Sequence, residues 1–261
     1  MEDVQSHPDP RGIPLERVGV SGVRFPGVVA GQATSVTASM SVSIAAEHRG
    51  AHMSRFLLAL EPHREALGLE RMPALLRELR ERMDAEAAEV DLRFPVFRRK
   101  AAPVSGESGW MDYEGRLVGR VDAEGLVVRA GAVVAVASLC PCSKAISDYG
   151  AHMQRGHVHL DVTPRRGESG AFAPLPFDDL VAVAERHASA PLYPVLKRPD
   201  ERHVTMQAYD TPAFVEDMAR GIAADLREDP RVEAFTVRVV NQESIHQHDA
   251  FAETSWSRSG R

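Results

Sequence analysis

The sequence predicts an α+β protein built from two related halves, each an antiparallel sheet with helices on one face. Strands, then two helices, then strands occur twice along the chain, an order typical of folds that place helices on one face of a sheet. Alternating apolar segments predict the strands, and apolar residues at helical spacing predict the helices. The hydrophobic fraction of 44% and charged fraction of 26% are those of an ordinary globular protein, so 261 residues can form one large domain or two small ones.

Composition and charge exclude several classes of protein. The net charge of −6 argues against a generic nucleic-acid binder. No apolar segment approaches the roughly 20 residues that span a bilayer, so we expect no membrane partner. The N-terminus lacks the basic start and apolar core of a signal peptide. The two cysteines, Cys140 and Cys142, are too close in sequence for an unstrained disulfide. These features predict a cytoplasmic protein with free or metal-bound thiols.

The first half of the chain is predicted to contain a leader, five strands and two helices. Residues 1–14 are polar and include prolines, so we expect a flexible leader. Alternation predicts strands at 17–24, 33–44, 92–100, 110–122 and 126–137, the last two forming a hairpin. We expect Ser54 to cap a helix that Pro62 breaks. A second helix is expected from near Pro73 to about Val90.

The second half is predicted to repeat this arrangement. Strands are expected at 158–162 and 232–240. Helices are expected at Phe177–His187 and Thr211–Asp229, with Thr211 as the N-cap of the latter. Ser189–Arg202 is predicted to be a proline-rich loop, and the chain from Asn241 a polar tail. The predicted modules are therefore 15–139 and 140–252, followed by a tail at 253–261.

The segment Leu139–Arg155 contains both cysteines and a histidine, His152, ten residues after Cys142. A thiolate and an imidazole presented by one loop can bind a borderline-soft metal such as zinc. They could instead form a nucleophile–base pair. The plain alternative is two small residues that end a buried strand, with a surface histidine nearby. The segment alone leaves these uses open.

Three further groups of polar residues could carry chemistry. His246 and His248 point to the same side of an extended segment, which suits metal ligation or proton transfer, unless the segment is a solvated tail. Glu201 lies in a charged loop that could present a carboxylate to a metal, or simply be an exposed turn. Glu216 lies near the start of a helix, where an acid complements the helix dipole or accepts paired N–H donors from a planar heterocycle.

Seven segments occur in a specific order: Arg17–Arg24, Gly50–Phe56, Cys140–Lys144 (Cys-Pro-Cys-Ser-Lys), Tyr149–His152, Tyr193–Glu201, Phe214–Asp217 and Glu243–Asp249 (Glu-Ser-Ile-His-Gln-His-Asp). Taken together they resemble the type IB GTP cyclohydrolases, over about residues 15–252. The resemblance implies two tandem tunnelling-fold (T-fold) modules that assemble into barrels. It also implies a homotetramer with active sites at subunit interfaces. The implied reaction converts GTP and water to formate and 7,8-dihydroneopterin triphosphate, the first step of tetrahydrofolate synthesis.

The resemblance also implies roles for individual residues. Cys140, His152 and Glu201 would ligate one divalent metal per site, with zinc, manganese and Fe(II) all compatible, and three ligands leave a position open for water. Glu216 would anchor the guanine edge. The residues expected in catalysis are Cys140, Glu216, Glu243, His246 and His248, and Cys142 is expected in the pocket.

No glycine-rich phosphate loop occurs in the sequence, so scattered cations would have to bind the triphosphate. From charge alone we place Arg49, His52, Arg55, Lys144 and Lys197 near it. Two positions depart from the family pattern: Met153 stands where we expect Asn, and Met206 where Glu is common. Neither is an expected ligand, so these departures affect only the expected polarity of the pocket.

Three alternatives stay open. An archaeal-type relative would release a cyclic phosphate of dihydroneopterin, together with phosphate or pyrophosphate. A non-catalytic purine- or pterin-binding T-fold protein would bind its ligand without releasing formate. A nitrile reductase relative would consume NADPH on a cyano-deazaguanine, but the Cys140–Lys144 and Glu243–Asp249 segments favour the cyclohydrolase.

Overall fold

The computed structural model describes residue 5 and residues 7–258. The chain divides into two compact units. The N-terminal unit comprises the residues up to Pro95 together with Arg116–Arg129, and the C-terminal unit comprises Val96–Gly115 and the residues from Ala130 onward. Three strands contribute to both units: β3 (Ala88–Ala101), β4 (Ser108–Asp122) and β5 (Gly125–Leu139). The division into modules at residues 139 and 140 therefore stays a prediction.

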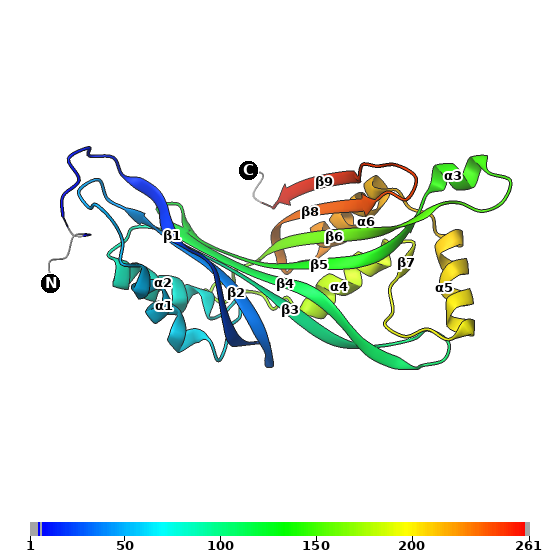
Figure 1. Ribbon diagram of the computed structural model, residues 1–261, viewed down its shortest axis with the longest axis horizontal. Coiled ribbons are helices and arrows are strands. Elements are labelled where there is room, and N and C mark those ends of the chain that lie inside the picture. The colour runs from blue at the N-terminus through cyan, green and yellow to red at the C-terminus, as the bar shows by residue number, and fades with distance from the viewer. Residues whose placement is uncertain (1–4, 6, 259–261) are drawn as a thin grey trace. The chain divides into compact units, whose positions relative to one another are not determined.

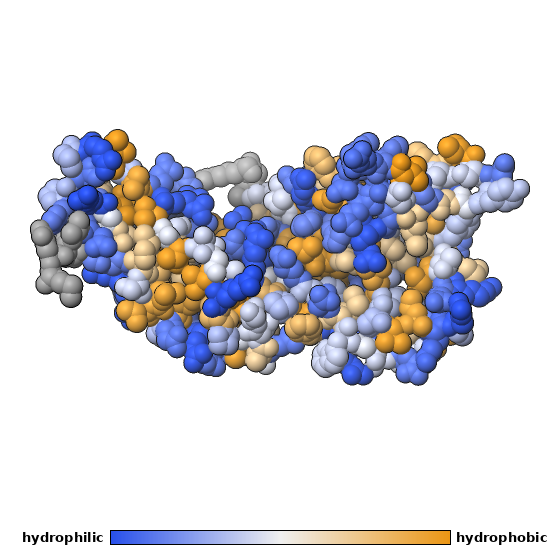
Figure 2. Space-filling view, in the orientation of Figure 1, coloured by the Kyte–Doolittle hydropathy of each residue, from blue (hydrophilic) through white to orange (hydrophobic). Residues whose placement is uncertain are grey.

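The described strands form one antiparallel sheet in the hydrogen-bonded order β1-β2-β3-β4-β5-β6-β8-β9, with β7 beside β5. The predicted hairpin is present, because β4 ends at Asp122 and β5 begins at Gly125. Helices accompany the sheet, so the predicted α+β class is confirmed. Figure 2 shows hydrophilic and hydrophobic residues interspersed over the visible face.

The N-terminal unit packs helices against a hairpin. Its elements are β1 (Leu15–Val29), β2 (Gln32–Ile44), α1 (Met53–Leu60), the 3₁₀ turn η2 (Glu61–His63) and α2 (Met72–Met83). Alternate residues of β2, including Val36 and Met40, are buried. They form a core with apolar residues of α1 and α2, which lie beside these strands (Figure 1). The alternation that predicted the strand is thus the alternation of its burial.

Two local predictions in this unit are wrong, and one is confirmed. Ser54 lies inside α1, whose N-cap is His52. The second helix ends before Asp84, which adopts a left-handed conformation (φ 50°, ψ 50°) and stops it well short of Val90. The chain then enters β3, because burial of alternate residues against β2 overrides the helical propensity of this stretch. Pro62 does interrupt the helix, within η2.

Part of the predicted leader is attached to the N-terminal unit. The Arg49 N–H donates to the His7 carbonyl at 3.1 Å, and the Gly50 N–H donates to the Gln5 carbonyl at 3.2 Å. Residues 1–4 and 6 of the predicted leader lie outside the described residues.

The C-terminal unit contains five of the seven segments that resemble the cyclohydrolases. Its further elements are α3 (Pro141–Ile146), β6 (Met153–Pro164), α4 (Phe177–Arg186), β7 (Ala190–Pro191), α5 (Arg198–Asp210), α6 (Val215–Glu228), β8 (Val232–Gln242) and β9 (Ala250–Ser257). Helices α4 and α6 lie on one side of these strands (Figure 1). Val158 and Val237 on the strands and Met218 on α6 are among the fully buried core residues.

The sequence missed helix α5. Ser189–Arg202 was expected to be a loop, yet α5 begins at Arg198. Asp200 and Ala208 are the only buried residues of α5, so the helix has no apolar stripe that periodicity could reveal. Thr211 is the C-cap of α5 and not the N-cap of the next helix. Helix α6 begins at Val215, after Phe214.

The predicted polar tail is also wrong within the described residues. Strand β9 pairs with β8 along its length, for example Arg238 with Glu253, so 253–257 belong to the sheet. The expected tail residues 259–261 lie outside the described part of the chain.

We expect Gly221→Ala to destabilise the protein, although alanine is normally the better helix former. A Cβ at this position of α6 would lie 2.3 Å from Nδ1 of His187. That ring cannot move freely, because its Nε2 lies 2.9 Å from Oδ2 of Asp225. Such overpacking typically costs about 1–3 kcal/mol, more than the 0.5–1 kcal/mol that Gly→Ala gains in an open helix. Urea denaturation measures the difference. In a His187→Ala background the same change should become neutral or stabilising, and a more stable Gly221→Ala single variant would contradict the prediction.

Candidate active site

The chain between β5 and β6 folds back on itself through Cys140, Ser143 and His152. The Cys140 N–H donates to the His152 carbonyl at 3.1 Å. Ser143 Oγ accepts the His152 N–H at 3.2 Å and donates to the Cys140 carbonyl at 3.1 Å. The Ser143 N–H donates to Cys140 Sγ at 3.4 Å, with Cys140 as the N-cap of the short helix α3. The structure therefore places the cysteine beside the histidine, as the sequence suggested.

The ring of His152 is oriented by two partners that the sequence analysis did not identify. Its Nδ1 lies 2.8 Å from Oε1 of Gln154 and 3.3 Å from Oγ of Ser244. The Gln154 contact fits the tautomer with its proton on Nδ1, in which Nε2 is the nitrogen that could bind a metal. Gln154 follows His152 by two residues, and residues two apart in an extended chain point to the same side. This spacing could have indicated the contact from the sequence.

The connection between β8 and β9 joins this group through Ser244. It also carries Glu243, which is half-buried, and the exposed His246 and His248. The two imidazole rings are stacked, with centroids 5.1 Å apart and an interplanar angle of 12°. The two rings lie side by side, but residues 244–248 form bends and not the extended segment that was expected. Their role in proton transfer stays a prediction.

The start of α6 presents Glu216 to solvent beside the same loops. The Ala213 N–H donates to the Leu139 carbonyl at 3.1 Å, which ties this segment to the residue before Cys140. Glu216 lines a groove of about 550 Å³ between α6 and β9, which also includes Arg220 and Trp256. A carboxylate at the mouth of a groove can accept hydrogen bonds from a flat ligand.

The start of α5 is fixed by a buried carboxylate. Asp200 accepts hydrogen bonds at 2.8 Å from the N–H groups of Val104, Ser105 and Lys197, and one at 2.6 Å from Ser105 Oγ. Glu201 follows directly, and its side chain is half-exposed and paired with Arg198 at 3.1 Å.

Glu201 does not join Cys140 and His152 within one chain. The Lys144 ammonium binds the Tyr209 carbonyl and lies 4.1 Å from the Tyr209 ring centroid, which places α3 at the C-terminal end of α5. Glu201 is at the other end of that helix, eight residues or about 12 Å away. Among the described residues no three Cys, His, Asp or Glu side chains are grouped to hold a metal. Within one chain the structure thus joins the backbones of two of the three expected ligand residues, Cys140 and His152.

The expected phosphate-binding cations are distributed over both units. Arg49, His52 and Arg55 belong to the N-terminal unit, where His52 and Arg55 line a cavity of about 200 Å³ and Arg55 donates to the Arg82 carbonyl at 3.2 Å. Lys144 and Lys197 belong to the C-terminal unit. Cys142 is exposed on α3. Their assignment to the triphosphate stays a prediction.

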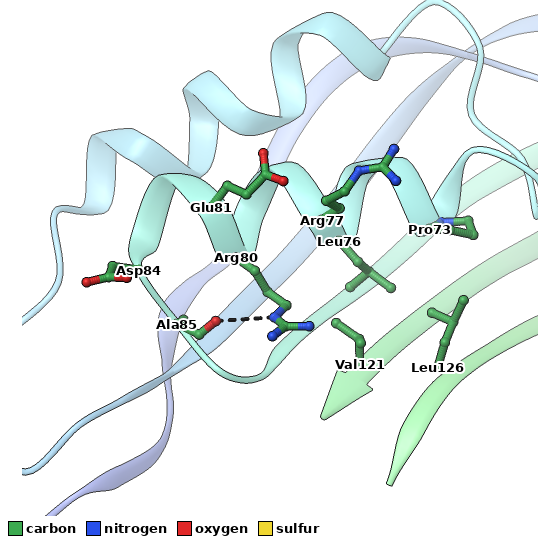
Figure 3. Close-up of a pocket in the computed structure, with 9 residues that line it drawn as sticks. All are labelled: Pro73, Leu76, Arg77, Arg80, Glu81, Asp84, Ala85, Val121 and Leu126. Atoms are coloured by element: carbon green, nitrogen blue, oxygen red, sulfur yellow. Dashed lines mark hydrogen bonds between the residues drawn. The ribbon is translucent and has the colours of Figure 1, made fainter. Parts of the chain in front are cut away.

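A larger groove of the N-terminal unit contains none of these expected site residues. It has a volume of about 490 Å³ and lies between α2 and the β4–β5 hairpin, lined by Leu76, Val121 and Leu126 (Figure 3). Nε of Arg80 in this groove donates to the Ala85 carbonyl at 3.2 Å.

The chain matches the family model described as type I GTP cyclohydrolase FolE2 over residues 1–252. It belongs to this family. Its relatives include the GTP cyclohydrolase FolE2 of Ralstonia nicotianae, 45% identical over 97% of this chain and 93% of the relative. The corresponding protein of Cupriavidus necator is 46% identical over the same shares. The predicted resemblance is therefore confirmed.

Solved structures support the tunnelling fold. Uricase from Arthrobacter globiformis has a TM-score of 0.54 at 10% identity, covering 94% of both chains. Urate oxidase from Bacillus sp. TB-90 has a TM-score of 0.51 at 8% identity, covering 94% of this chain and all of that one. At such low identity the likeness concerns the fold alone, and it confirms the T-fold expected for this FolE2 family member. Within the described residues, no helix has both the length and the apolar character required to cross a membrane.

We expect Asp200→Asn to destabilise this FolE2 family member at neutral pH but not in strong acid. Burial raises the pKa of Asp200, but the hydrogen bonds from Ser105, Lys197 and Val104 lower it more, so it lies well below the usual 3.8. A depressed pKa means that the carboxylate stabilises the fold above pH 3.8 and loses this contribution as the pH falls below it.

The measurement is urea denaturation of both proteins at pH 7, 5 and 3. The difference in unfolding free energy between the parent protein and Asp200→Asn should be equal at pH 7 and 5 and smaller at pH 3. Asp210→Asn, an exposed aspartate in the same helix, is the matched control and should stay within about 0.5 kcal/mol of the parent. A gap that persists unchanged at pH 3 would show that the charge of Asp200 is not responsible.

Proposed function

We propose that this protein is a GTP cyclohydrolase that converts GTP and water to formate and 7,8-dihydroneopterin triphosphate in folate biosynthesis. Membership of the FolE2 family over nearly the whole chain supports this proposal. The single structural observation that carries it is the pairing of Cys140 with His152, whose ring is oriented by Gln154 and reached by Ser244 from the β8–β9 connection.

The proposed enzyme uses one divalent cation per site, with zinc, manganese and Fe(II) as candidates. The residues present fit such an ion in part: Cys140 and His152 are joined through their backbones, and sulfur and imidazole ligands suit these metals. The third expected ligand, Glu201, lies elsewhere in the same chain, so a complete set needs Glu201 from a second subunit or a rearrangement of α5. When bound, the ion would activate water for hydrolysis at C8 of the purine.

An interface between subunits also fits the surface around the candidate site. Large apolar side chains are exposed there: Ile146 is 85% exposed, Tyr149 91% and Ile245 63%. Hydrophobic surface is visible over α3 in Figure 2. Exposed apolar residues gathered at one place indicate a surface that a partner covers. We therefore propose a homo-oligomer, a tetramer by resemblance to the family, that works in the cytoplasm.

The remaining residues have proposed roles that follow from their positions. Glu216 accepts N–H donors of the guanine edge, because it is exposed at the mouth of a groove. The stacked His246 and His248, with Glu243, accept and return protons during the hydrolytic steps, since imidazole nitrogens can both donate and accept a proton. Cys142, which is exposed on α3 close to Cys140, is proposed to contact the substrate.

The test is purified protein, stripped of metal and then given GTP with zinc, manganese or Fe(II) in turn. We expect equal molar amounts of formate and of a fluorescent pterin with at least one metal. Release of phosphate or pyrophosphate at turnover would favour a cyclic phosphate product instead. Binding of GTP without formate would favour a non-catalytic T-fold protein, and consumption of NADPH on a cyano-deazaguanine a nitrile reductase.

A further inference from the structure

A buried hydroxyl–amide pair connects three segments of the candidate site. Ser138 Oγ donates to the Ala213 carbonyl at 3.0 Å. It accepts a hydrogen bond from Nδ2 of Asn241 at 2.8 Å. The side chain of Ser138 thus joins the end of β5, the segment before α6 and the end of β8. These contacts span 75 and 103 residues of sequence.

The pair lies in the protein interior, where removing polar groups from water costs free energy. Ser138 is fully buried and Asn241 is 2% exposed. Oδ1 of Asn241 has no hydrogen-bond partner among the described residues. It faces Gly156 of β6, where an added Cβ would lie only 2.8 Å away. A core that served stability alone would be as well filled by apolar residues, since buried polar groups gain little net stability. The presence of this buried polar pair therefore points to a role in fixing the geometry of the segments that it joins.

Each segment that this pair joins continues within two or three residues to a candidate site residue. Cys140 follows Ser138 by two residues, and Glu243 follows Asn241 by two. Glu216 follows Ala213 by three residues, in the first turn of α6. The intervening Leu139 is also held at both backbone atoms: its N–H donates to Ser189 Oγ at 3.0 Å, and its carbonyl accepts from Ala213.

We propose that Ser138 and Asn241 are positioning residues that set Cys140, Glu216 and Glu243 relative to one another. This inference rests on the proposed function, which makes those three residues a metal ligand, a guanine anchor and a proton-transfer group. Ser138 uses its single O–H donor and one of its two acceptor lone pairs in this role. Ser138→Ala removes both hydrogen bonds at once and leaves the Asn241 amide unpaired.

The first measurement is steady-state kinetics with GTP for Ser138→Ala, Asn241→Leu and the double variant. Partners that hold a site residue in place typically contribute about 10–100-fold to activity, so we expect kcat/KM to fall by that factor. A raised KM is expected together with a lowered kcat, because Glu216 contacts the base. The two substitutions should not be additive: the double variant should lose about as much as either single variant.

The matched control is Thr34→Val in the N-terminal unit, where Thr34 Oγ1 donates to the Pro95 carbonyl at 2.8 Å. It loses a comparable hydroxyl–carbonyl bond and should leave KM and kcat of the folded protein unchanged. A merely structural role of Ser138 would lower the folded fraction and the apparent kcat with KM unchanged, and this result would overturn the proposal.

The second measurement, hydrogen–deuterium exchange followed by mass spectrometry, does not depend on activity. Ser138→Ala should speed exchange in 140–146, 213–217 and 243–249 together, and Thr34→Val in none of them. Faster exchange confined to the end of β5 would overturn the proposal. If the parent protein releases no formate from GTP, the proposed function fails, and the exchange data still decide whether the pair holds the three segments. Ser138→Ala is the mild variant that keeps the test valid if Asn241→Leu does not fold.

Discussion

Cys140→Ala is expected to abolish formate release from GTP and to weaken binding of the divalent metal. Cys140 is an expected ligand whose backbone contacts that of His152, and its sulfur accepts a hydrogen bond from the Ser143 N–H. Loss of an outer-shell partner of a metal site typically costs about 10–100-fold in affinity or activity, and loss of a ligand itself should cost more. Formate release and bound metal per chain are the measurements.

The neighbouring cysteine provides the control for metal binding. Cys142 is exposed on α3, and Cys142→Ala should keep the metal content of the parent protein. Unchanged turnover of Cys140→Ala would remove Cys140 from the ligand set. Equal loss of metal from both variants would instead indicate that either sulfur can bind the ion.

Glu216→Gln is expected to lower kcat/KM for GTP by about 10²–10⁴. A guanine edge offers two neighbouring N–H donors, and each hydrogen bond to a charged acceptor is worth about 1.5–3 kcal/mol. Gln keeps one neutral acceptor oxygen but turns an NH2 group toward the second donor, so one bond is weakened and the other is lost with its donor left unpaired. Each 1.4 kcal/mol corresponds to a tenfold change, which gives this range. The groove beside Glu216 between α6 and β9 has room for a planar ligand. Initial rates over a range of GTP concentrations measure the effect.

Substitution of the neighbouring Asp217 is the control that distinguishes guanine binding from an effect on helix stability. Asp217 Oδ2 accepts the Phe214 N–H at 3.1 Å at the start of α6. Asn keeps an oxygen that can accept this N–H, so Asp217→Asn should cost only the interaction of the charge with the helix dipole, about 0.3–1 kcal/mol of stability, with little change in the kinetics of the folded protein. If Glu216→Gln kept the parent kcat/KM while Asp217→Asn lost it, the guanine anchor would be the wrong residue.

Local patterns in the sequence determined the fold class and most strands. In β2, alternating residues such as Val36 and Met40 are buried because successive side chains of a strand point to opposite faces, so the pattern of burial is also a pattern in the sequence. The same reasoning found the β4–β5 hairpin. The ordered set of seven segments, including 140–144 and 243–249, indicated the family that the family model then showed.

Features that depend on distant partners were decided only by the tertiary structure. Helix α5 was missed because only Asp200 and Ala208 of it are buried, which leaves no apolar stripe to detect. The burial of Asp200 depends on Val104 and Ser105, nearly a hundred residues earlier in the chain.

The candidate site shows the same division. The sequence named Cys140 and His152, which lie close together in the chain, and the structure confirms that they are neighbours. It could not show that Glu201 lies apart from them, nor that Ser138 and Asn241 meet across 103 residues. Periodicity records which face of an element is buried, whereas a long-range hydrogen bond depends on how the elements pack and leaves no local pattern.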